Sequence, residues 1–149
     1  MGGEQLGEPG VEGRADQPPQ LLVGQAVEAV ARIAERHLVC VVTSKPVTFA
    51  RPILTHLGVT PSLTFVEGPA LDSADEPKKV TLARAVERLG PAADGAVMVG
   101  DRHHDVDAGK AHGLRTVGVL WGIGDADELR AAGADHLVAT PEALVELLT

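Results

Sequence analysis

Two aspartates, Asp101 and Asp105, follow the short apolar run 97–99 and Gly100. An apolar run that ends in glycine is typical of a buried strand in a parallel sheet, and open α/β sheets bind their ligands at the carboxyl ends of such strands. Two carboxylates held there offer the oxygen ligands that Mg²⁺ prefers. The same residues are compatible with a structural role, in which Asp101 caps a turn and Asp105 caps the next helix.

Two further segments carry groups that suit a phosphate. Thr43, Ser44 and Lys45 follow the apolar run 38–42, just before a predicted helix. A hydroxyl, free backbone N–H groups and a helix N-terminus can cradle a phosphate, although plain helix capping explains the same residues. Lys78 stands at the start of another predicted helix, where a cation is unfavourable unless an anion lies nearby; a solvated surface lysine is the alternative. Hydroxyl, lysine and paired carboxylates together describe a Mg²⁺-assisted phosphoryl site.

Strands and helices alternate along the chain and would position these groups. Continuous apolar runs predict strands at 38–42, 63–66, 96–99, 116–120 and 136–138. Helical spacing and end signals predict helices over 24–36, after Pro46 to Leu57, over 78–89, over 105–112, from Asp125 to Gly133 and from Thr140 onward. Asp125 and Glu128 have the spacing of a capping box. The alternation implies an α/β domain with a doubly wound parallel sheet.

Composition narrows the class of protein. The 149 residues carry a formal net charge of -8, which argues against nucleic-acid and anionic-membrane partners. Cys40 is the one cysteine, so no disulfide framework exists, and no apolar stretch approaches the roughly 20 residues that span a bilayer. We expect a cytoplasmic protein with a disordered or loosely packed leader at 1–20 and a core domain at 21–149.

The motifs also carry a resemblance. The sequence at 41–46, Lys78 twelve positions before Gly90, and the Gly100–Asp105 motif resemble, in this order, the haloacid dehalogenase (HAD) superfamily and most closely its phosphoglycolate-phosphatase-like hydrolases. The flanking segments 111–114, 117–122 and 132–135 are similar to the family as well, and the resemblance covers roughly 22–149. It implies a Rossmann-like core that hydrolyses small phosphorylated metabolites with Mg²⁺ through an aspartyl-phosphate intermediate.

The resemblance also implies roles for individual residues. Thr43 and Lys78 would be catalytic, because the Thr43 hydroxyl and the Ser44 backbone would bind the phosphoryl group and Lys78 would neutralise its charge. Asp101, the third catalytic residue, would bind Mg²⁺ directly, and Asp105 would support the metal through water or by orienting its ligands.

The chain departs from the family pattern at one point. Before the first matched helix it has no apolar strand ending in Asp-x-Asp and no helical cap, so it resembles the C-terminal part of such an enzyme. In the family, that strand lies between those matching 38–42 and 96–99. Without it, two half-sheets either close directly or keep unpaired edges, and such edges favour a homo-oligomer or a strand-complementing partner. The alternative is that the chain is a non-catalytic relic of such an enzyme, which binds a phosphorylated ligand or a partner chain.

Overall fold

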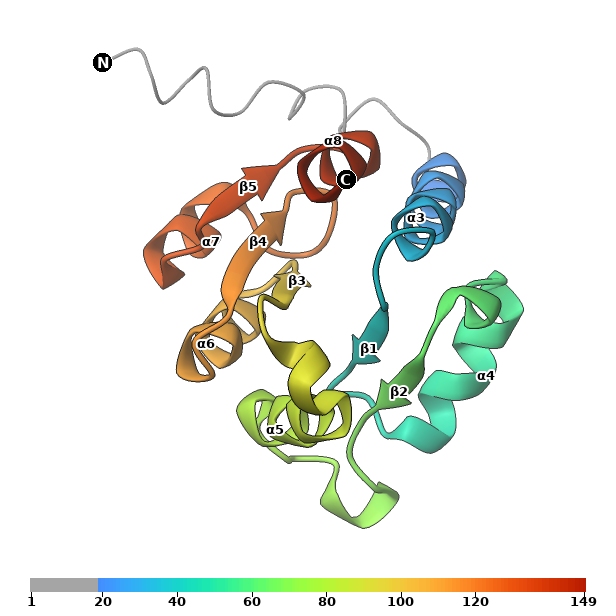
Figure 1. The fold of residues 1–149 in the computed structure, drawn as a ribbon, viewed down its shortest axis with the longest axis vertical. Helices are drawn as coiled ribbons and strands as arrows, with labels where there is room; N and C mark the ends of the chain where they lie inside the picture. Colours follow the sequence, from blue (N-terminus) through green and yellow to red (C-terminus); the bar gives the residue numbers. More distant parts are fainter. Residues whose placement is uncertain (1–18) are drawn as a thin grey trace.

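The computed structural model describes residues 19–149, which form six α-helices, five short strands and three 3-10 turns (Figure 1). The helices are α3 (Pro19–Ala34), α4 (Val47–Leu57), α5 (Lys78–Leu89), α6 (His103–Ala111), α7 (Ala126–Ala132) and α8 (Pro141–Leu148). The strands are β1 (Cys40–Val42), β2 (Phe65–Glu67), β3 (Val97–Gly100), β4 (Arg115–Val119) and β5 (His136–Val138). The 3-10 turns are η1 (Thr60–Ser62), η2 (Leu71–Ser73) and η3 (Gly90–Ala93).

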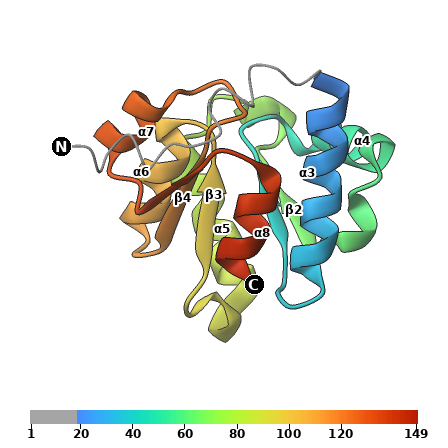
Figure 2. The same ribbon diagram turned by 90° about the horizontal axis from the view of Figure 1, so that it is seen from above.

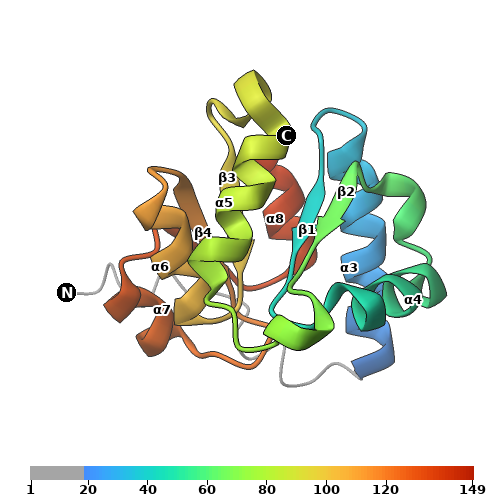
Figure 3. The ribbon, with the colours of Figure 1, turned by 90° about the horizontal axis from the view of Figure 1, so that it is seen from below.

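Every paired strand runs parallel to its neighbour, and helices cover both faces. β1 pairs with β2, while β3, β4 and β5 form a second sheet in that order. Figures 2 and 3 show α3 and α8 on one face and α5, α6 and α7 on the other. This arrangement confirms the predicted doubly wound α/β fold, built as an incomplete Rossmann-like core.

The two sheets do not pair with each other. Within residues 19–149, no strand lies between β1 and β3, and the facing edges of these two strands stay open. Of the two expected outcomes, the structure therefore has the unpaired edges and not direct closure. α5 bridges the two sheets, because it contacts β1 and packs in one apolar cluster with Met98 of β3 and Val42 of β1.

Local sequence signals placed most elements correctly. All five strands lie within two residues of their predicted bounds. Gly58 and Gly133 adopt left-handed conformations that end α4 and α7, and the Thr140 hydroxyl caps α8 by accepting the Ala143 N–H at 3.1 Å. α6 begins two residues before the predicted Asp105.

The N-terminal boundary differs from the prediction. α3 begins at Pro19, earlier than the predicted residue 24, while the leader expected at 1–20 lies, up to residue 18, outside the described residues. No helix in the described part of the chain is long and apolar enough to cross a membrane.

Candidate functional site

Lys78 lies where the two half-sheets meet. It is the first residue of α5, and its Nζ lies 3.0 Å from Asp105 Oδ1 and donates to the Val42 carbonyl of β1 at 3.1 Å. The two charged side chains are 13% and 10% exposed, so the pair is largely shielded from water. Asp105 thus supplies the anion that the position of Lys78 requires. Because Asp105 follows β3 and Val42 ends β1, the carboxyl ends of both strands lie on the same side of the molecule.

Asp105 is held by more than this ion pair. It is the third residue of α6, and its Oδ2 accepts the backbone N–H groups of Asp101 at 3.1 Å and Arg102 at 3.2 Å. It therefore caps the helix, as the structural alternative expected, and also pairs with Lys78. Gly100 is required here, because a Cβ at this position would collide with the Asp105 side chain. With both oxygens engaged, Asp105 is suited to orient neighbouring groups.

Asp101 follows β3 and packs against the loop 121–124. Its Oδ2 accepts the Ile123 N–H at 2.8 Å, and its carbonyl accepts the Gly124 N–H at 3.1 Å. A Cβ on Gly122 would overlap the Asp101 carboxylate, so the loop can approach this closely only with glycine there. Oδ1 of Asp101 accepts no hydrogen bond from the described residues and remains available to a ligand.

Thr43 follows β1 and folds the chain into the turn before α4. Its Oγ1 accepts the Lys45 N–H at 3.0 Å, and its own N–H donates to the Glu67 carbonyl at 2.9 Å. Ser44 and Lys45 are exposed. The Thr43 hydroxyl therefore caps a turn rather than α4, whose N-cap residue Pro46 provides no side-chain hydrogen bond. The turn presents the exposed Ser44 beside the carboxyl end of β1.

Glu128 positions the Asp101 segment from α7, and the sequence did not reveal this role. Its Oε2 accepts the Arg102 Nε–H and the His103 backbone N–H, both at 2.8 Å. Both hydrogen bonds lower the pKa of the Glu128 carboxyl, and the bond between Arg102 and Glu128 raises the pKa of the Arg102 guanidinium. The predicted capping box is half correct: Asp125 accepts the Glu128 N–H at 2.9 Å, whereas the Glu128 carboxylate reaches across to α6.

A second network secures the start of α5. Arg84 donates to both carboxylate oxygens of Glu76, at 2.9 and 2.8 Å, and to Glu67 of β2 at 3.2 Å. The hydrogen bond from Arg84, reinforced by one from Thr81, lowers the pKa of Glu76. Glu76 lies two residues before Lys78, so the network fixes the segment that delivers the lysine.

These contacts determine which groups of the site could hold a divalent cation. No group of three or more His, Cys, Asp or Glu side chains that could hold a metal occurs within residues 19–149. Mg²⁺, however, often binds through one or two carboxylates and completes its shell with water and phosphate oxygens. Asp101, whose Oδ1 has no partner among residues 19–149, fits such a ligand, and Asp105 fits a supporting position.

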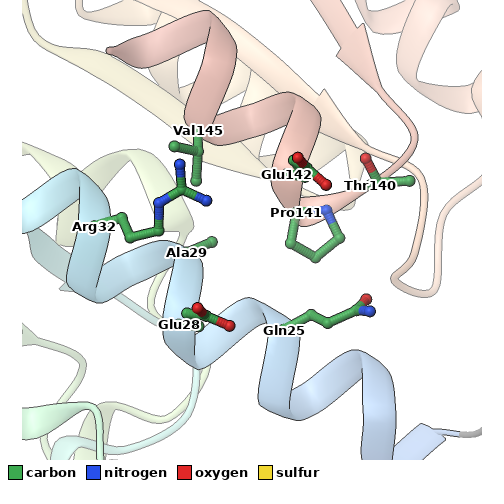
Figure 4. Close-up of a pocket in the computed structure, with 8 residues that line it drawn as sticks. All are labelled: Gln25, Glu28, Ala29, Arg32, Thr140, Pro141, Glu142 and Val145. Carbon is green, nitrogen blue, oxygen red and sulfur yellow. The ribbon is translucent and has the colours of Figure 1, made fainter.

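Two hollows flank α3. One, of about 320 Å³, lies beside Asp101 and is lined mainly by apolar residues of α3, β3 and the segment after β4, including Val30, Val99 and Trp121. The other, of about 340 Å³, lies between α3 and α8 (Figure 4). It is lined by Gln25, Glu28 and Arg32 on one side and Thr140, Pro141 and Glu142 on the other. Of its lining residues, Ala29 alone also lines the first hollow.

Comparisons with known proteins agree on one family. The HAD-hydrolase-like family model matches residues 74–146. The tyrosine-protein kinase PtkA of Mycobacterium tuberculosis is 45% identical over 87 residues, which are 58% of this chain and 30% of PtkA. A 5'-nucleotidase of Pseudomonas aeruginosa is 34% identical over 118 residues, 79% of this chain and 53% of that protein. A phosphoglycolate phosphatase of Xanthomonas campestris is 37% identical over 108 residues, 71% and 48% of the respective chains.

A solved structure supports the same grouping. The crystal structure of a predicted phosphatase from Clostridium acetobutylicum superposes with a TM-score of 0.71 and 32% identity, over 74% of this chain and 51% of that one. The chain spans between 30% and 53% of the length of the curated relatives described, and about half of this solved structure.

Proposed function

Because the chain belongs to the haloacid dehalogenase superfamily, in its phosphoglycolate-phosphatase-like branch, we propose that its site binds phosphomonoesters and serves their Mg²⁺-dependent hydrolysis. The curated relatives named above include a nucleotidase, a phosphoglycolate phosphatase and a tyrosine kinase. Each of these names describes a protein that hydrolyses or transfers a phosphoryl group. The hydrolase family model and the phosphatase relatives favour hydrolysis over transfer to an acceptor.

The observation that carries this proposal is that the ends of β1 and β3 both contact Lys78. Its ammonium group lies at the carboxyl ends of β1 and β3 at once, bound to the Val42 carbonyl and to Asp105. Ligands of open α/β sheets bind at this edge. An ammonium group carries three donors, of which the described residues occupy two, so one is left for a phosphate oxygen.

The other residues complete the proposed roles. The Thr43 hydroxyl and the Ser44 N–H bind the phosphoryl oxygens at the end of β1, and Asp101 holds the metal at the end of β3. Bound Mg²⁺ would supply Lewis-acid stabilisation of the negative charge on the phosphoryl oxygens. Asp105 holds the Lys78 ammonium group and the Asp101 backbone in position through the contacts described above. We expect small phosphorylated metabolites of the cytoplasm as ligands and no nucleic acid.

A second candidate function is phosphate-ligand binding without turnover. It is favoured by the acidic groups at the site, because the described residues provide Asp101 and Asp105 but no third carboxylate beside them. The aspartyl-phosphate chemistry of the family requires a nucleophilic carboxylate with an unengaged oxygen. Asp105 is fully engaged, and Asp101 is the proposed metal ligand.

One pair of assays separates these functions. The purified chain is incubated with p-nitrophenyl phosphate with and without Mg²⁺, and phosphate binding is measured by calorimetry. Turnover that requires Mg²⁺ and disappears in Asp101→Asn supports the phosphatase; binding without turnover supports the second function. The matched control is Asp127→Asn, since that carboxylate is 96% exposed on α7. Absence of both turnover and phosphate binding would refute both functions.

A further inference from the structure

The hollow of about 320 Å³ adjoins Asp101, the residue proposed to hold the metal. Val99 of β3 and Val119 of β4 line it on the side of the sheet, and Val30 of α3 and Leu144 of α8 line it on the side of the helices. Figure 2 shows α3 and α8 on the same face of the molecule. The hollow therefore lies between the second sheet and these two helices, at the carboxyl ends of β3 and β4.

The lining of this hollow is almost entirely apolar. Among the described residues that line it, Asp101 carries the one charged side chain, and the Trp121 indole N–H is the one other polar side-chain group. All remaining lining residues are alanine, valine, leucine or glycine. A hydroxyl or a charged group buried here would lose its hydrogen bonds to water with almost no replacement, whereas an apolar group would gain by leaving water.

The hollow is accessible and large enough for an aromatic ring. Val30, Val99 and Trp121 are half-buried, so parts of these side chains still face water and would be covered by a ligand. An apolar cavity of about 150 Å³ is sufficient to bind benzene. A hollow of about 320 Å³ therefore accommodates one ring or one branched alkyl group, together with the atoms that link it to a phosphoryl group.

Asp101 connects the hollow with the proposed phosphoryl site. Its Oδ2 accepts the Ile123 N–H of the loop that carries Trp121, and its Oδ1 has no partner among residues 19–149. The same carboxylate thus belongs to the lining of the hollow and offers an oxygen to a metal. A phosphomonoester held at Asp101 would have its ester group next to the hollow.

We propose that the site selects phosphomonoesters whose ester group is an aryl or branched alkyl group, and that this group occupies the hollow. The inference rests on the proposed binding of phosphomonoesters and names the substrate class. Esters of sugars and other polyols are disfavoured, because the lining offers their hydroxyls almost no hydrogen-bond partners.

Phosphonates test the proposal on the full chain, because their phosphorus–carbon bond resists hydrolysis and binding can be measured without turnover. Calorimetry with Mg²⁺ compares benzylphosphonate, which carries a ring, with dihydroxypropylphosphonate, which carries a polar chain, and methylphosphonate, which has almost no substituent. We expect benzylphosphonate to bind at least about tenfold more tightly than the other two. Equal affinities would overturn the proposal and leave the proposed function intact, whereas no binding of any phosphonate would overturn both.

The fluorescence of Trp121 provides a second readout, because it is the one tryptophan of the chain and it lines the hollow. Benzylphosphonate should change the emission with the same Kd that calorimetry gives. Methylphosphonate, which leaves the hollow empty, should leave the emission unchanged. Tight binding of benzylphosphonate without a change in emission would place the ring elsewhere and overturn the proposal.

A matched pair of variants on α3 localises the ring. Ala26 lines the hollow, whereas Ala31 is exposed on the same helix and does not line it. Ala26→Leu should fill part of the hollow and weaken benzylphosphonate about fivefold or more while methylphosphonate is unaffected, and Ala31→Leu should leave both affinities within about twofold. An unchanged affinity for benzylphosphonate in Ala26→Leu would overturn the proposal.

Two more variants separate the hollow from the phosphoryl site. Val30→Thr keeps the shape of the side chain and adds a hydroxyl, so it should weaken benzylphosphonate about threefold or more even if Ala26→Leu does not fold. Lys78→Met should weaken all three phosphonates by the same factor, because it removes a phosphate contact and leaves the hollow unchanged. A preference for the ring that disappeared in Lys78→Met would contradict the assignment of the ring to the hollow.

Discussion

The ion pair between Lys78 and Asp105 should make the largest single electrostatic contribution to the free energy of unfolding at the site. The side chains are 13% and 10% exposed and lie 3.0 Å apart. Removing one partner of a buried pair typically costs 3–5 kcal/mol because the other charge is left without compensation. Asp105 keeps two backbone N–H donors in Lys78→Met, so we expect the lower end, about 3 kcal/mol of unfolding free energy.

A double-mutant cycle in urea measures this coupling. Asp105→Asn should cost about 2 kcal/mol, because the amide retains an acceptor for the backbone donors. The double variant should cost less than the sum of the two by about 1.5–3 kcal/mol. Lys79→Met, at the exposed neighbouring lysine, should change stability by less than about 0.5 kcal/mol. Additive costs of the two substitutions would refute the assignment of a coupled buried pair.

Three further predictions concern the surroundings of the site. The pKa of the Glu128 carboxyl is lowered, so this carboxylate stabilises the folded chain above its ordinary pKa of 4.5, and the stabilisation is lost as the pH falls through the lower pKa of the folded state. The difference in unfolding free energy between the wild type and Glu128→Gln, measured in urea, should therefore shrink below pH 4.5. Gly122→Ala should cost about 1–3 kcal/mol and weaken phosphate binding measured by calorimetry, because its Cβ overlaps Asp101, whereas Gly24→Ala on α3, with open space around it, should stabilise by about 0.5–1 kcal/mol. Pro52 lies inside α4, so thermal melts should show Pro52→Ala stabilised by about 2 kcal/mol, which is the interior-proline cost of about 3 less about 1 for the freer unfolded chain.

Features of the fold that depend on local sequence were predictable. Apolar runs located the strands, and glycine and threonine signals located helix ends such as Gly58 and Thr140, because caps and turns depend on a few neighbouring residues. The sequence also predicted that the segments carrying Thr43, Lys78 and Asp101 lie close together: two of them follow β1 and β3, and the third begins α5, where Lys78 contacts Val42 and Asp105. Only their order along the chain and the rule for ligands of parallel sheets were needed.

Partners across the fold were not predictable. Glu128 was recognised as a capping residue, yet its carboxylate bonds to Arg102, 26 positions away. Arg84 and Glu76 gave no signal, since charged residues on a helix and in a loop are usually solvated. Periodicity identifies which face of an element is buried, but it carries no information on which charged groups from distant segments meet.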